Sequence, residues 1–453
     1  MSSAANIDVI ILAAGQGTRM KSALPKVLHP VGGRALISHV LAAASALANT
    51  NLHIVIGQNA EALQQHVETT HPDLKIKWVQ QTEQLGTGHA VQQTLPNLGA
   101  SNTALVLYGD VPLIETNVLS ELVEIAARRQ LALLTTKLDE PAGYGRIVRD
   151  ANGDVNEIVE HRDCDDSQLG IDEVNTGFMA LPVAMLSDTL AKLENNNDQQ
   201  EYYLTDVIKL AKAQGGSITG VCTDDFASVL GVNDRRDLAI CEKHYQARRA
   251  LAYMESGVTI VDPDRVTFRG DVSIAPDTSL DINTVIEGPT QIGSHVVIGA
   301  NSIVRASTLA DGCVIEPNCV IEDADVGASA AVGPFARIRP GSELGENVRI
   351  GNFVEVKNSK ISAGAKANHL SYVGDTDVGA NTNIGAGVIT CNYDGAYKHR
   401  TVIGENVFVG SDCQLVAPVT IADNATIGAG TTVTNDVEAD VLIISRVKQR
   451  SVR

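Results

Sequence analysis

Aromatic side chains are scarce in this 453-residue chain. They make up 4% of it, and Trp78 is the single tryptophan, whereas 39 residues are glycine. This composition argues against a large aromatic core and predicts tightly packed coils of small residues in part of the chain. The length is too great for one hydrophobic core and fits two or three domains.

Positive charge is also in short supply. The chain has 35 lysines and arginines against 54 aspartates and glutamates, which gives a net charge of −19 at pH 7. A protein this acidic repels nucleic acid, so we expect no nucleic-acid partner. If its substrates are anionic phosphates, the few basic residues must gather locally against an unfavourable overall field.

Paired cysteines and long apolar runs are both missing. The seven cysteines form no C-x-x-C pair and no His/Cys spacing typical of zinc, which predicts reduced thiols in a reducing compartment. The N-terminus lacks a basic segment followed by an apolar one, and no apolar run approaches the ~18–20 residues that span a bilayer. We therefore expect a cytoplasmic protein without membrane insertion.

The first half of the chain alternates short apolar runs with helix-like segments. Runs at 8–14, 52–56 and 104–107 are typical of buried parallel strands, and segments 35–48 and 60–68 are typical of helices. This alternation predicts an α/β domain with a Rossmann-like, doubly wound parallel sheet. In such sheets, ligands bind beyond the carboxyl ends of the strands.

A glycine-rich, basic turn follows the first of these strands. Gly15 and Gly17 let backbone N–H groups approach phosphate oxygens, while Arg19 and Lys26 bring positive charge to the same end of the sheet. The dinucleotide-binding pattern G-x-G-x-x-G is excluded, because Met20 stands where its third glycine would be. The turn therefore predicts a site for nucleotide phosphates.

Polar residues at strand ends and in apolar strings extend this site. Asp110 ends a strand, where its carboxylate either holds Mg²⁺ or caps a helix. Glu160 and Asn175 interrupt apolar strings and suit recognition of a sugar's hydroxyl or acetamido groups; the alternatives are that Glu160 is solvated and that Asn175 only satisfies a turn. Segment 81–90 offers amides and a glycine-rich turn suited to the edge of a base.

The second half carries a six-residue repeat. Aliphatic residues recur every six positions over 326–356 and again over 403–433, and many of them are followed by glycine. A period of six fits neither a helix nor a run of β-hairpins and predicts a parallel β-helix, in which short strands stack coil on coil. The rhythm slips near 356–361 and breaks across 390–400, where we expect a loop to leave the coils.

The segment between the two halves has a composition of its own. Residues 233–256 are charged, rich in helix formers and free of glycine and proline, which predicts a linker helix. We therefore expect an α/β domain over 1–232, the linker helix over 233–256, and a β-helix domain with a C-terminal tail over 257–453.

Polar residues also interrupt the aliphatic rhythm of the β-helix. His369 is the candidate general base, because imidazole titrates near neutral pH and can take a proton from an amine. The alternative is that His369 merely caps a corner of a coil. Tyr372, close along the chain, and the string CNYDG at 391–395 favour the catalytic role.

Longer strings resemble known families. LAAGQGTRM at 12–20, followed by Pro25 and Lys26, resembles the signature of the sugar-nucleotide pyrophosphorylases. A left-handed β-helix of hexapeptide repeats resembles the acyltransferases that use CoA thioesters and are commonly trimers. With EQLGTGHA, LYGDVPLI, YGRIVR, IVEH, NTGF and EYYLTDVI in order, residues 7–447 resemble the bacterial bifunctional N-acetylglucosamine-1-phosphate uridyltransferase / glucosamine-1-phosphate N-acetyltransferase family.

This resemblance implies two transfers on one metabolite. Acetyl-CoA would acetylate glucosamine-1-phosphate, and the product would react with UTP to give pyrophosphate and UDP-N-acetylglucosamine, a precursor for cell-wall and lipopolysaccharide synthesis. The resemblance also implies Mg²⁺ as cofactor and a homotrimer with shared acetyltransferase sites. Two other hypotheses stay open: a pyrophosphorylase whose β-helix only oligomerises or regulates, and a non-enzymatic scaffold with a degenerate nucleotidyltransferase sequence.

The resemblance further assigns roles to individual residues. In the first domain it makes Arg19 and Lys26 catalytic phosphate ligands and gives Mg²⁺ to Asp110 and Asn233. It assigns UTP and N-acetylglucosamine-1-phosphate to Leu12, Ala13, Gly15, Gln81, Gly86, Thr87, Tyr108, Gly145, Glu160, Asn175 and Asn233. In the β-helix it makes His369 catalytic, assigns glucosamine-1-phosphate to Arg339, Lys357, Tyr372 and Asn392, with Tyr393 as a further substrate contact, and assigns acetyl-CoA to Asn383, Ala386, Ser411, Ala429 and Arg446.

Overall fold

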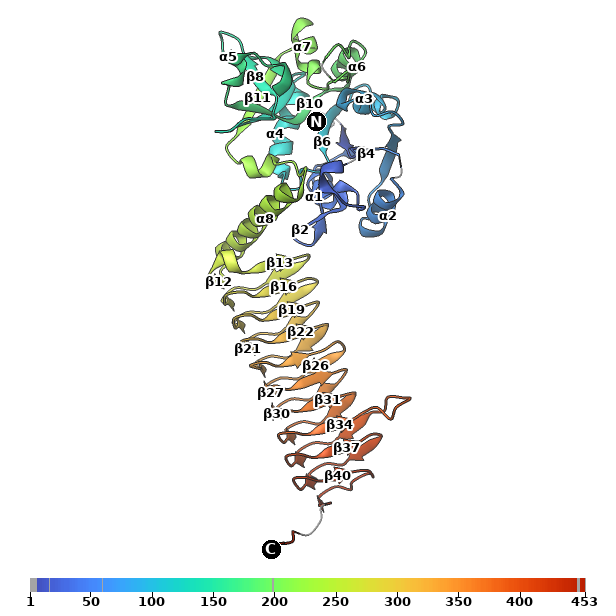
Figure 1. The fold of residues 1–453 in the computed structure, drawn as a ribbon, viewed down its shortest axis with the longest axis vertical. Helices are drawn as coiled ribbons and strands as arrows, with labels where there is room; N and C mark the ends of the chain where they lie inside the picture. The colour runs from blue at the N-terminus through green and yellow to red at the C-terminus, as the bar shows by residue number, and fades with distance from the viewer. Residues whose placement is uncertain (1–5, 16, 59, 198, 446–448, 453) are drawn as a thin grey trace, which may run out of the picture. The chain divides into compact units, whose positions relative to one another are not determined.

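The chain divides into two compact units, Met1–Tyr245 and Gln246–Arg453 (Figure 1). The structure is a computed structural model that describes residues 6–15, 17–58, 60–197, 199–445 and 449–452. The division falls within helix α8 (Arg235–Glu255). Over the residues described, no helix combines the length and the apolar character needed to cross a membrane.

One mixed β-sheet forms the centre of the first unit. Its order is β11-β7-β10-β6-β1-β4-β5, with β8 and β9 pairing beside β10. The expected parallel direction is wrong for β10, which runs antiparallel to β6 and β7. The antiparallel β8–β9 hairpin and the short helix α5 (Asp166–Leu169) lie between β7 and β10 in the chain. The strands are β1 (Ile7–Leu12), β4 (Thr50–Ile56), β5 (Ile76–Gln80), β6 (Thr103–Tyr108), β7 (Leu131–Lys137), β8 (Arg146–Arg149), β9 (Val155–Val159), β10 (Glu173–Pro182) and β11 (Ile218–Thr223).

Helices cover both faces of this sheet, which confirms the doubly wound α/β fold. Alternate residues of β1 point to opposite faces, so Val9 and Ile11 join one buried cluster and Ile10 the other. This explains why the strand is apolar without interruption. One cluster contains residues of α1 (Leu36–Ser45), α2 (Glu61–Thr70) and α4 (Thr116–Ala127), and the other contains residues of α3 (Thr87–Gln92), α6 (Val183–Leu190) and α7 (Asp206–Ala213).

The second unit stacks flattened coils whose short strands form three parallel sheets (Figure 1). The first face contains β12 (Thr259–Ile260), β15 (Ser279–Leu280), β18 (Val297–Ile298), β21 (Val314–Ile315), β24 (Ala331–Val332), β27 (Arg349–Asn352), β30 (Lys366–His369), β33 (Asn383–Ile384), β36 (Phe408–Val409), β39 (Thr426–Ile427) and β41 (Leu442–Ile443). The second face contains β13 (Thr267–Arg269), β16 (Val285–Glu287), β19 (Ile303–Arg305), β22 (Val320–Glu322), β25 (Arg337–Ile338), β28 (Glu355–Lys357), β31 (Tyr372–Gly374), β34 (Ile389–Cys391), β37 (Gln414–Val416) and β40 (Thr432–Val433). The third face contains β14 (Val272–Ile274), β17 (Thr290–Ile292), β20 (Thr308–Leu309), β23 (Ala324–Val326), β26 (Ser342–Leu344), β29 (Lys360–Ile361), β32 (Thr376–Val378), β35 (Thr401–Ile403) and β38 (Val419–Ile421).

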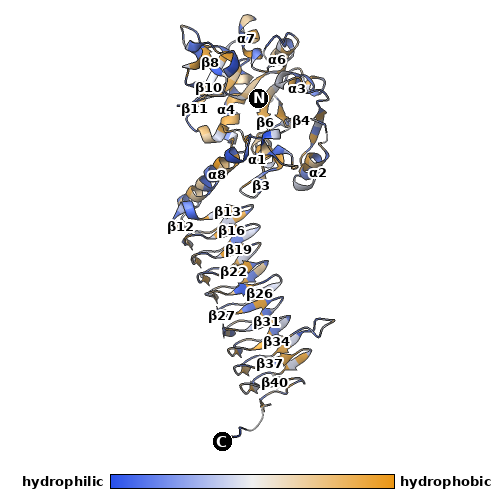
Figure 2. Cartoon of the chain, in the orientation of Figure 1, coloured by the Kyte–Doolittle hydropathy of each residue, from blue (hydrophilic) through white to orange (hydrophobic). Residues whose placement is uncertain are grey.

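The hexapeptide aliphatic residues form the dry interior of these coils. Ile338, Leu344 and Ile350 come from the second, third and first faces in turn, and all three are buried in one cluster. Hydrophobic and hydrophilic residues therefore interleave along every coil (Figure 2). The sheets have the arrangement of a left-handed β-helix, as the period of six predicts.

Left-handed backbone residues mark the corners between the faces. Asn283, Asn301 and Asn318 occupy the corner from the first to the second face in successive coils, each with φ near +60°. Asparagine tolerates this conformation better than most residues, and here the side chains also bond to one another: Asn283 donates to Asn301 at 2.9 Å and Asn301 to Asn318 at 3.3 Å. The small and polar residues between the aliphatic positions are therefore required by the turns.

The slip in the repeat arises at the corner from the second to the third face. The inward-facing Val356 and Ile361 are five positions apart instead of six, and the left-handed residue Asn358 lies between them. In the next coil Asp375 takes the same position, with φ 50°. One coil further on, the corner opens into the loop between β34 and β35. The expected loop is confirmed, and it leaves the coil next to Asp375, whose carbonyl oxygen accepts from the N–H of Thr401 at 3.2 Å.

A buried carboxylate ties together the amino ends of the strands in the first unit. Asp8 of β1 is 1% exposed, and its oxygens accept from His53 (3.1 Å), Asn51 (3.0 Å), Asn102 (2.8 Å) and the N–H of Gly99 (2.9 Å). Burial alone would raise the pKa of Asp8, but these hydrogen bonds lower it. Burial also lowers the pKa of His53, although Asp8 opposes this shift.

We expect Asp8→Ala to destabilise the first unit by about 3 kcal/mol, because it leaves several buried donors without an acceptor. Denaturant unfolding followed by the fluorescence of Trp78, in β5 of the same unit, measures the loss. Asp73→Ala, at an exposed position, is the control that should change little.

The same pair predicts a pH dependence of stability. Both folded-state pKa values lie below their unfolded values, so the stabilisation is complete only above the ordinary histidine pKa of about 6.5. It should fall as the pH drops through about 6.5, where His53 gains a proton on unfolding, and again below about 4, where Asp8 does. Unfolding free energies that stay level between pH 7 and pH 5 would contradict this.

Candidate active sites

A cleft of about 430 Å³ lies at the carboxyl edge of the first sheet. A second hollow of about 290 Å³ shares Gly15, Lys26 and Asn233 with it. Both are formed by the segments that follow β1, β5 and β6, as the strand order requires. Together they bring the following sequence-predicted residues into one place: Leu12, Ala13, Gly15, Arg19, Lys26, Gln81, Gly86, Thr87, Tyr108, Asp110 and Asn233.

Charged and amide side chains are paired within this cleft. Lys26 and Asp110 form an ion pair, with side chains 15% and 17% exposed. Arg19 donates from Nη2 to Oδ1 of Asn233 at 3.1 Å. The N–H of Val232 donates to the carbonyl oxygen of Asp110 at 2.9 Å. This bond joins the segment that carries Asn233 to the segment that carries Asp110. Lys26 and Asn233 therefore line both hollows, while Asp110 lines the larger one and Arg19 the smaller.

Each glycine of the basic turn has a specific reason to be there. Gly17 has φ 61°, and a Cβ atom there would lie 2.7 Å from Cβ of Lys26, so any side chain would displace this lysine. At Gly15, a Cβ atom would meet no protein atom within 4 Å. The backbone at Gly15 therefore faces open space in the cleft, where a ligand can approach closely.

The proposed base-recognition segment is held by a distant part of the chain. Gln81 donates to the carbonyl oxygen of Gly86 at 3.2 Å. The N–H of Tyr202 donates to Leu85, and the N–H of Gly88 donates to Tyr202, each at 2.8 Å. Gly86 has φ 104°, and a Cβ atom there would lie 2.7 Å from the carbonyl oxygen of Tyr202. The 85–88 turn is thus fixed in place.

Sequence reasoning missed two residues of this cleft, Gln84 and Glu201. Gln84 donates to the carbonyl oxygen of Ala14 at 2.7 Å, which links the base-recognition segment to the phosphate turn. Gln84 lies within segment 81–90, whose amide side chains already predict base recognition, so the sequence could have identified it. Glu201 reaches the cleft through a tertiary contact between distant segments, which no local pattern announces.

The three residues assigned to the sugar lie together but do not line this cleft; a Cβ atom at Gly145 would lie 3.5 Å from Oε2 of Glu160. The N–H of Asn175 donates to the carbonyl oxygen of Gly145 at 2.8 Å. Glu160 accepts from the hydroxyl of Thr205 at 3.0 Å, and its burial raises its pKa. Glu160 is therefore not simply solvated. The Asn175 side chain does serve a turn, because its Oδ1 accepts from the N–H of Gly177 at 2.9 Å.

The side chain of Tyr108, at the end of β6, is strongly shielded from solvent. Burial raises the pKa of Tyr108, and the nearby Asp110 and Glu160 add to the shift. Its ring meets Phe178 edge-on, with 6.1 Å between centroids. A Cβ atom at Gly177 would lie 2.5 Å from this ring, so Gly177 makes room for Tyr108.

A column of charged residues on the second face locates a candidate site in the β-helix. Side chains at one position alternate in sign from coil to coil, with Arg305 lying 3.4 Å from Glu287 and 3.9 Å from Glu322. The alternation then fails, because the next two members are both cations. In order, the column is Arg269, Glu287, Arg305, Glu322, Arg339 and Lys357. Two adjacent cations on an acidic protein are suited to bind an anion.

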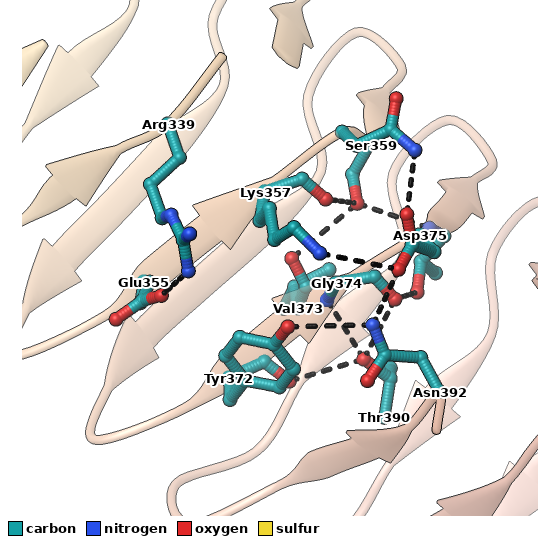
Figure 3. Close-up of polar contacts among 12 residues, drawn as sticks. Arg339, Glu355, Lys357, Ser359, Tyr372, Val373, Gly374, Asp375, Thr390 and Asn392 are labelled. Atoms are coloured by element: carbon teal, nitrogen blue, oxygen red, sulfur yellow. Dashed lines mark hydrogen bonds and ion pairs between the residues drawn. The ribbon is translucent and has the colours of Figure 1, made fainter. Parts of the chain in front are cut away.

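The two cations are held by carboxylates on neighbouring positions (Figure 3). Arg339 donates to Glu355 at 2.7 Å, and Lys357 lies 3.6 Å from Asp375. Asn392, from the loop between β34 and β35, donates to the same Asp375 and to the hydroxyl of Tyr372, at 3.3 Å for the latter (Figure 3). Lys357, Tyr372 and Asn392 are therefore brought together as the sequence predicts.

The loop adds a cation that the sequence analysis did not single out. This cation is Lys398, and Lys357 lowers its pKa. Tyr393, in contrast, is 61% exposed, and its hydroxyl donates to the carbonyl oxygen of Gly395 within the loop. Lys398 lies within residues 390–400, where the repeat breaks, but its relation to Lys357 depends on the fold of the loop.

His369 ends β30 and is exposed, so its ring does not enter the dry interior. Its Nδ1 lies 2.9 Å from Oδ1 of Asn352, the residue directly opposite it on β27. An amide oxygen only accepts, so this contact places the imidazole proton on Nδ1 and leaves the Nε2 lone pair available as a base. Asn352 was not predicted from the sequence.

Most residues assigned to acetyl-CoA continue the column that begins at His369. The strands pair Ala367 with Ile384, Ile384 with Val409 and Val409 with Ile427. Two positions further along, these coils carry His369, Ala386, Ser411 and Ala429. Asn383 lies in β33 of the same face. Arg446 lies outside the described residues.

Comparison with known proteins covers both units. The MobA-like NTP transferase domain matches residues 9–203, the GMPPB C-terminal domain matches residues 268–349, and six bacterial transferase hexapeptide repeats match residues 400–435. Proteins named "Bifunctional protein GlmU" from Pseudomonas putida F1, Stutzerimonas stutzeri A1501 and Pseudomonas syringae pv. syringae B728a are each 51% identical over 447 residues. These matches cover 99% of this chain and 97%, 98% and 97% of the relatives.

Half of the aligned residues are thus identical along almost the entire length of both partners, and the two recognised domain types occur in the expected order. The chain belongs to the bifunctional GlmU family.

Proposed function

We propose that this chain catalyses two consecutive transfers. Acetyl-CoA acetylates glucosamine-1-phosphate, and the resulting N-acetylglucosamine-1-phosphate takes a uridylyl group from UTP, giving UDP-N-acetylglucosamine and pyrophosphate. The observation that carries the proposal is the presence of two separate local gatherings of cations on one acidic chain. One lies at the carboxyl edge of the nucleotide-type sheet and the other on the hexapeptide β-helix, in a chain whose relatives are named bifunctional.

Neither alternative hypothesis accounts for these features. A β-helix that only oligomerises or regulates has no need of adjacent cations at Arg339 and Lys357, nor of an exposed imidazole oriented by Asn352. A degenerate scaffold has no need of Lys26 and Asp110 paired in a cleft. Membership of a bifunctional family supports the same conclusion.

Uridylyl transfer requires positioning and charge neutralisation and no side-chain nucleophile. A phosphate oxygen of N-acetylglucosamine-1-phosphate attacks the α-phosphorus of UTP, a new P–O bond forms, and the bond to pyrophosphate breaks. Lys26 and Arg19 would stabilise the negative charge on the phosphates. Uracil would be bound by Gln81, Gly86 and Thr87, and the sugar by Gly145, Glu160 and Asn175.

The residues of the cleft fit Mg²⁺. Among the described residues no cluster of three or more His, Cys, Asp or Glu side chains could hold a metal, which agrees with an ion that takes few protein ligands and keeps waters and phosphates. Asp110 and Asn233 supply two oxygen ligands that line the same cleft, and we propose them as its protein ligands. Bound there, Mg²⁺ would offset phosphate charge.

We expect Asp110→Asn to lower the rate of pyrophosphate release by at least about 100-fold, because Lys26 loses its partner and Mg²⁺ would lose its charged protein ligand. Acetyl transfer, followed as free thiol released from acetyl-CoA, should be unchanged. Asp224→Asn, exposed in the same unit, serves as the control. Activity within a few-fold of the unchanged protein would contradict the metal assignment.

The substitution Gly15→Ala tests whether UTP phosphates contact the backbone at Gly15, without disturbing the fold. The added methyl group meets no protein atom within 4 Å, so the thermal midpoint should stay the same. If UTP phosphates approach this backbone, the KM for UTP should rise about 10-fold or more, since losing a hydrogen bond to a charged group costs roughly 1.5–3 kcal/mol. An unchanged KM would show that phosphates do not lie against Gly15.

Acetyl transfer requires a neutral amine and a base. The Nε2 of His369 would take a proton from the amino group of glucosamine-1-phosphate as this nitrogen attacks the thioester carbon. A C–N bond forms, the C–S bond breaks, and CoA leaves as a thiol. We propose that a backbone N–H near Ala386 stabilises the developing oxyanion, and that Arg339, Lys357, Tyr372 and Asn392 bind the sugar phosphate.

His369→Ala should reduce thiol release by roughly 10²–10⁴-fold, the usual contribution of a positioned general base. Uridylyl transfer from supplied N-acetylglucosamine-1-phosphate should continue at the normal rate. His295→Ala, at the corner between the third and first faces of an earlier coil, is the control and should affect neither reaction. Loss of both activities in folded protein would contradict two independent sites.

We further propose a cytoplasmic homotrimer with acetyl sites shared between subunits. Hexapeptide repeats are compatible with such an assembly. Support comes also from Phe335, Phe353 and Leu370, which are 51%, 55% and 63% exposed on the corner next to His369. Arg446, in this proposal, contacts acetyl-CoA. We keep 1–232, 233–256 and 257–453 as the proposed functional division of the chain.

A further inference from the structure

Asp375 is a buried carboxylate at the centre of the cluster on the second face, and no role has been given to it so far. It is 7% exposed and accepts from the side-chain amides of Asn358 and Asn392 (Figure 3). It also lies 3.6 Å from the ammonium group of Lys357. It therefore contacts residues of the preceding coil and of the loop.

The backbone around Asp375 is fixed by buried hydroxyl groups. Ser359 donates to the carbonyl oxygen of Lys357 at 2.8 Å and accepts from the N–H of Thr376 at 3.0 Å. Thr390, an inward-facing residue, accepts from the N–H of Gly374 at 2.8 Å. These bonds hold both neighbours of Asp375, so the carboxylate has little freedom to move.

An ionised carboxylate dictates how the neighbouring amides must point. It can only accept hydrogen bonds, so Asn392 must turn its NH₂ group toward Asp375. The same NH₂ group also donates to the hydroxyl of Tyr372. The amide oxygen of Asn392 then faces away and accepts no hydrogen bond from the described residues. It is left as an acceptor for a ligand that donates.

The carboxylate also balances the charge of the cluster. Lys357 lowers the pKa of Lys398, as expected for two ammonium groups that repel each other. The negative charge of Asp375 lowers this repulsion, while Glu355 does the same for Arg339. Arg339 and Lys357 remain adjacent cations in the column, which suits them to bind a phosphate.

We propose that Asp375 is a positioning residue of the acetyltransferase site, which fixes Asn392 as an acceptor for a donor group of the amino sugar and holds Lys357 for its phosphate. This inference rests on the proposed acetyl transfer. Asp375 acts through residues that bind the sugar phosphate and does not touch the thioester or His369. Its loss should therefore weaken sugar-phosphate binding selectively.

The test is Asp375→Asn in the full-length chain. Asparagine has nearly the same shape and tolerates a positive φ, but it offers one acceptor oxygen where two amides compete, and it carries no charge. We expect the KM for glucosamine-1-phosphate to rise at least 10-fold, while kcat and the KM for acetyl-CoA change less than about threefold. Uridylyl transfer should be unaffected.

Asp323→Asn is the matched control. Asp323 occupies the same corner in an earlier coil, has φ 45° and is exposed. Its substitution makes the same chemical change on the same backbone conformation, and it should leave every kinetic constant as it is.

Two outcomes would overturn the proposal about Asp375. One is an unchanged KM for glucosamine-1-phosphate. The other is a fall in kcat with a rise in both KM values and a lower thermal midpoint, which would mean that the carboxylate only supports the fold. Absence of thiol release in the unsubstituted protein would instead refute the proposed acetyl transfer on which this inference rests.

Discussion

In-register stacking of the coils is the constraint on which the second unit depends. Because each strand pairs with the same strand one coil away, every outward side chain lies next to its counterparts above and below. Charges of one sign would repel along such a column, and the Arg269–Glu287–Arg305–Glu322 alternation avoids this. Where two cations are adjacent, at Arg339 and Lys357, carboxylates offset only part of their repulsion. In the proposed site a phosphate would relieve the rest, and this anion site would follow from an interruption in an otherwise alternating column.

In the first unit, the stabilising contacts and the candidate active site lie at opposite edges of the sheet. At the amino ends of its strands, Asp8 and His53 are buried, and the Asp8 carboxylate accepts hydrogen bonds from His53 and from neighbouring amides. At the carboxyl ends, the turns leave Lys26, Asp110 and open backbone at Gly15 facing a cleft. The same parallel strands produce both edges, because all their carboxyl ends point one way. Antiparallel β10 joins the sheet without disturbing this edge.

Period and motif were enough to predict most of this architecture. The runs at 8–14 and 104–107 predicted β1 and β6, and the aliphatic spacing predicted the stacked coils, since each depends only on residues near one another in the chain. Other features depend on how distant segments meet, which local patterns do not encode. These are the direction of β10, the position of Glu201 and the proximity of Lys398 to Lys357. Asp375 was overlooked for another reason: a single Asp among many corner residues is unremarkable until the fold surrounds it with two amides and a lysine.

The column that starts at His369 also sets a length. Ala386, Ser411 and Ala429 follow at intervals of one coil, and strands pair about 4.8 Å apart, so His369 and Ala429 are separated by about 14 Å. In the proposed acetyl transfer, a carrier that presents its acyl group to the amine beside His369 and also contacts Ala429 must span that distance in an extended form. Under that assignment, the spacing of the coils would favour acyl groups carried on a long, flexible arm, because a short thioester at His369 would not reach Ala429.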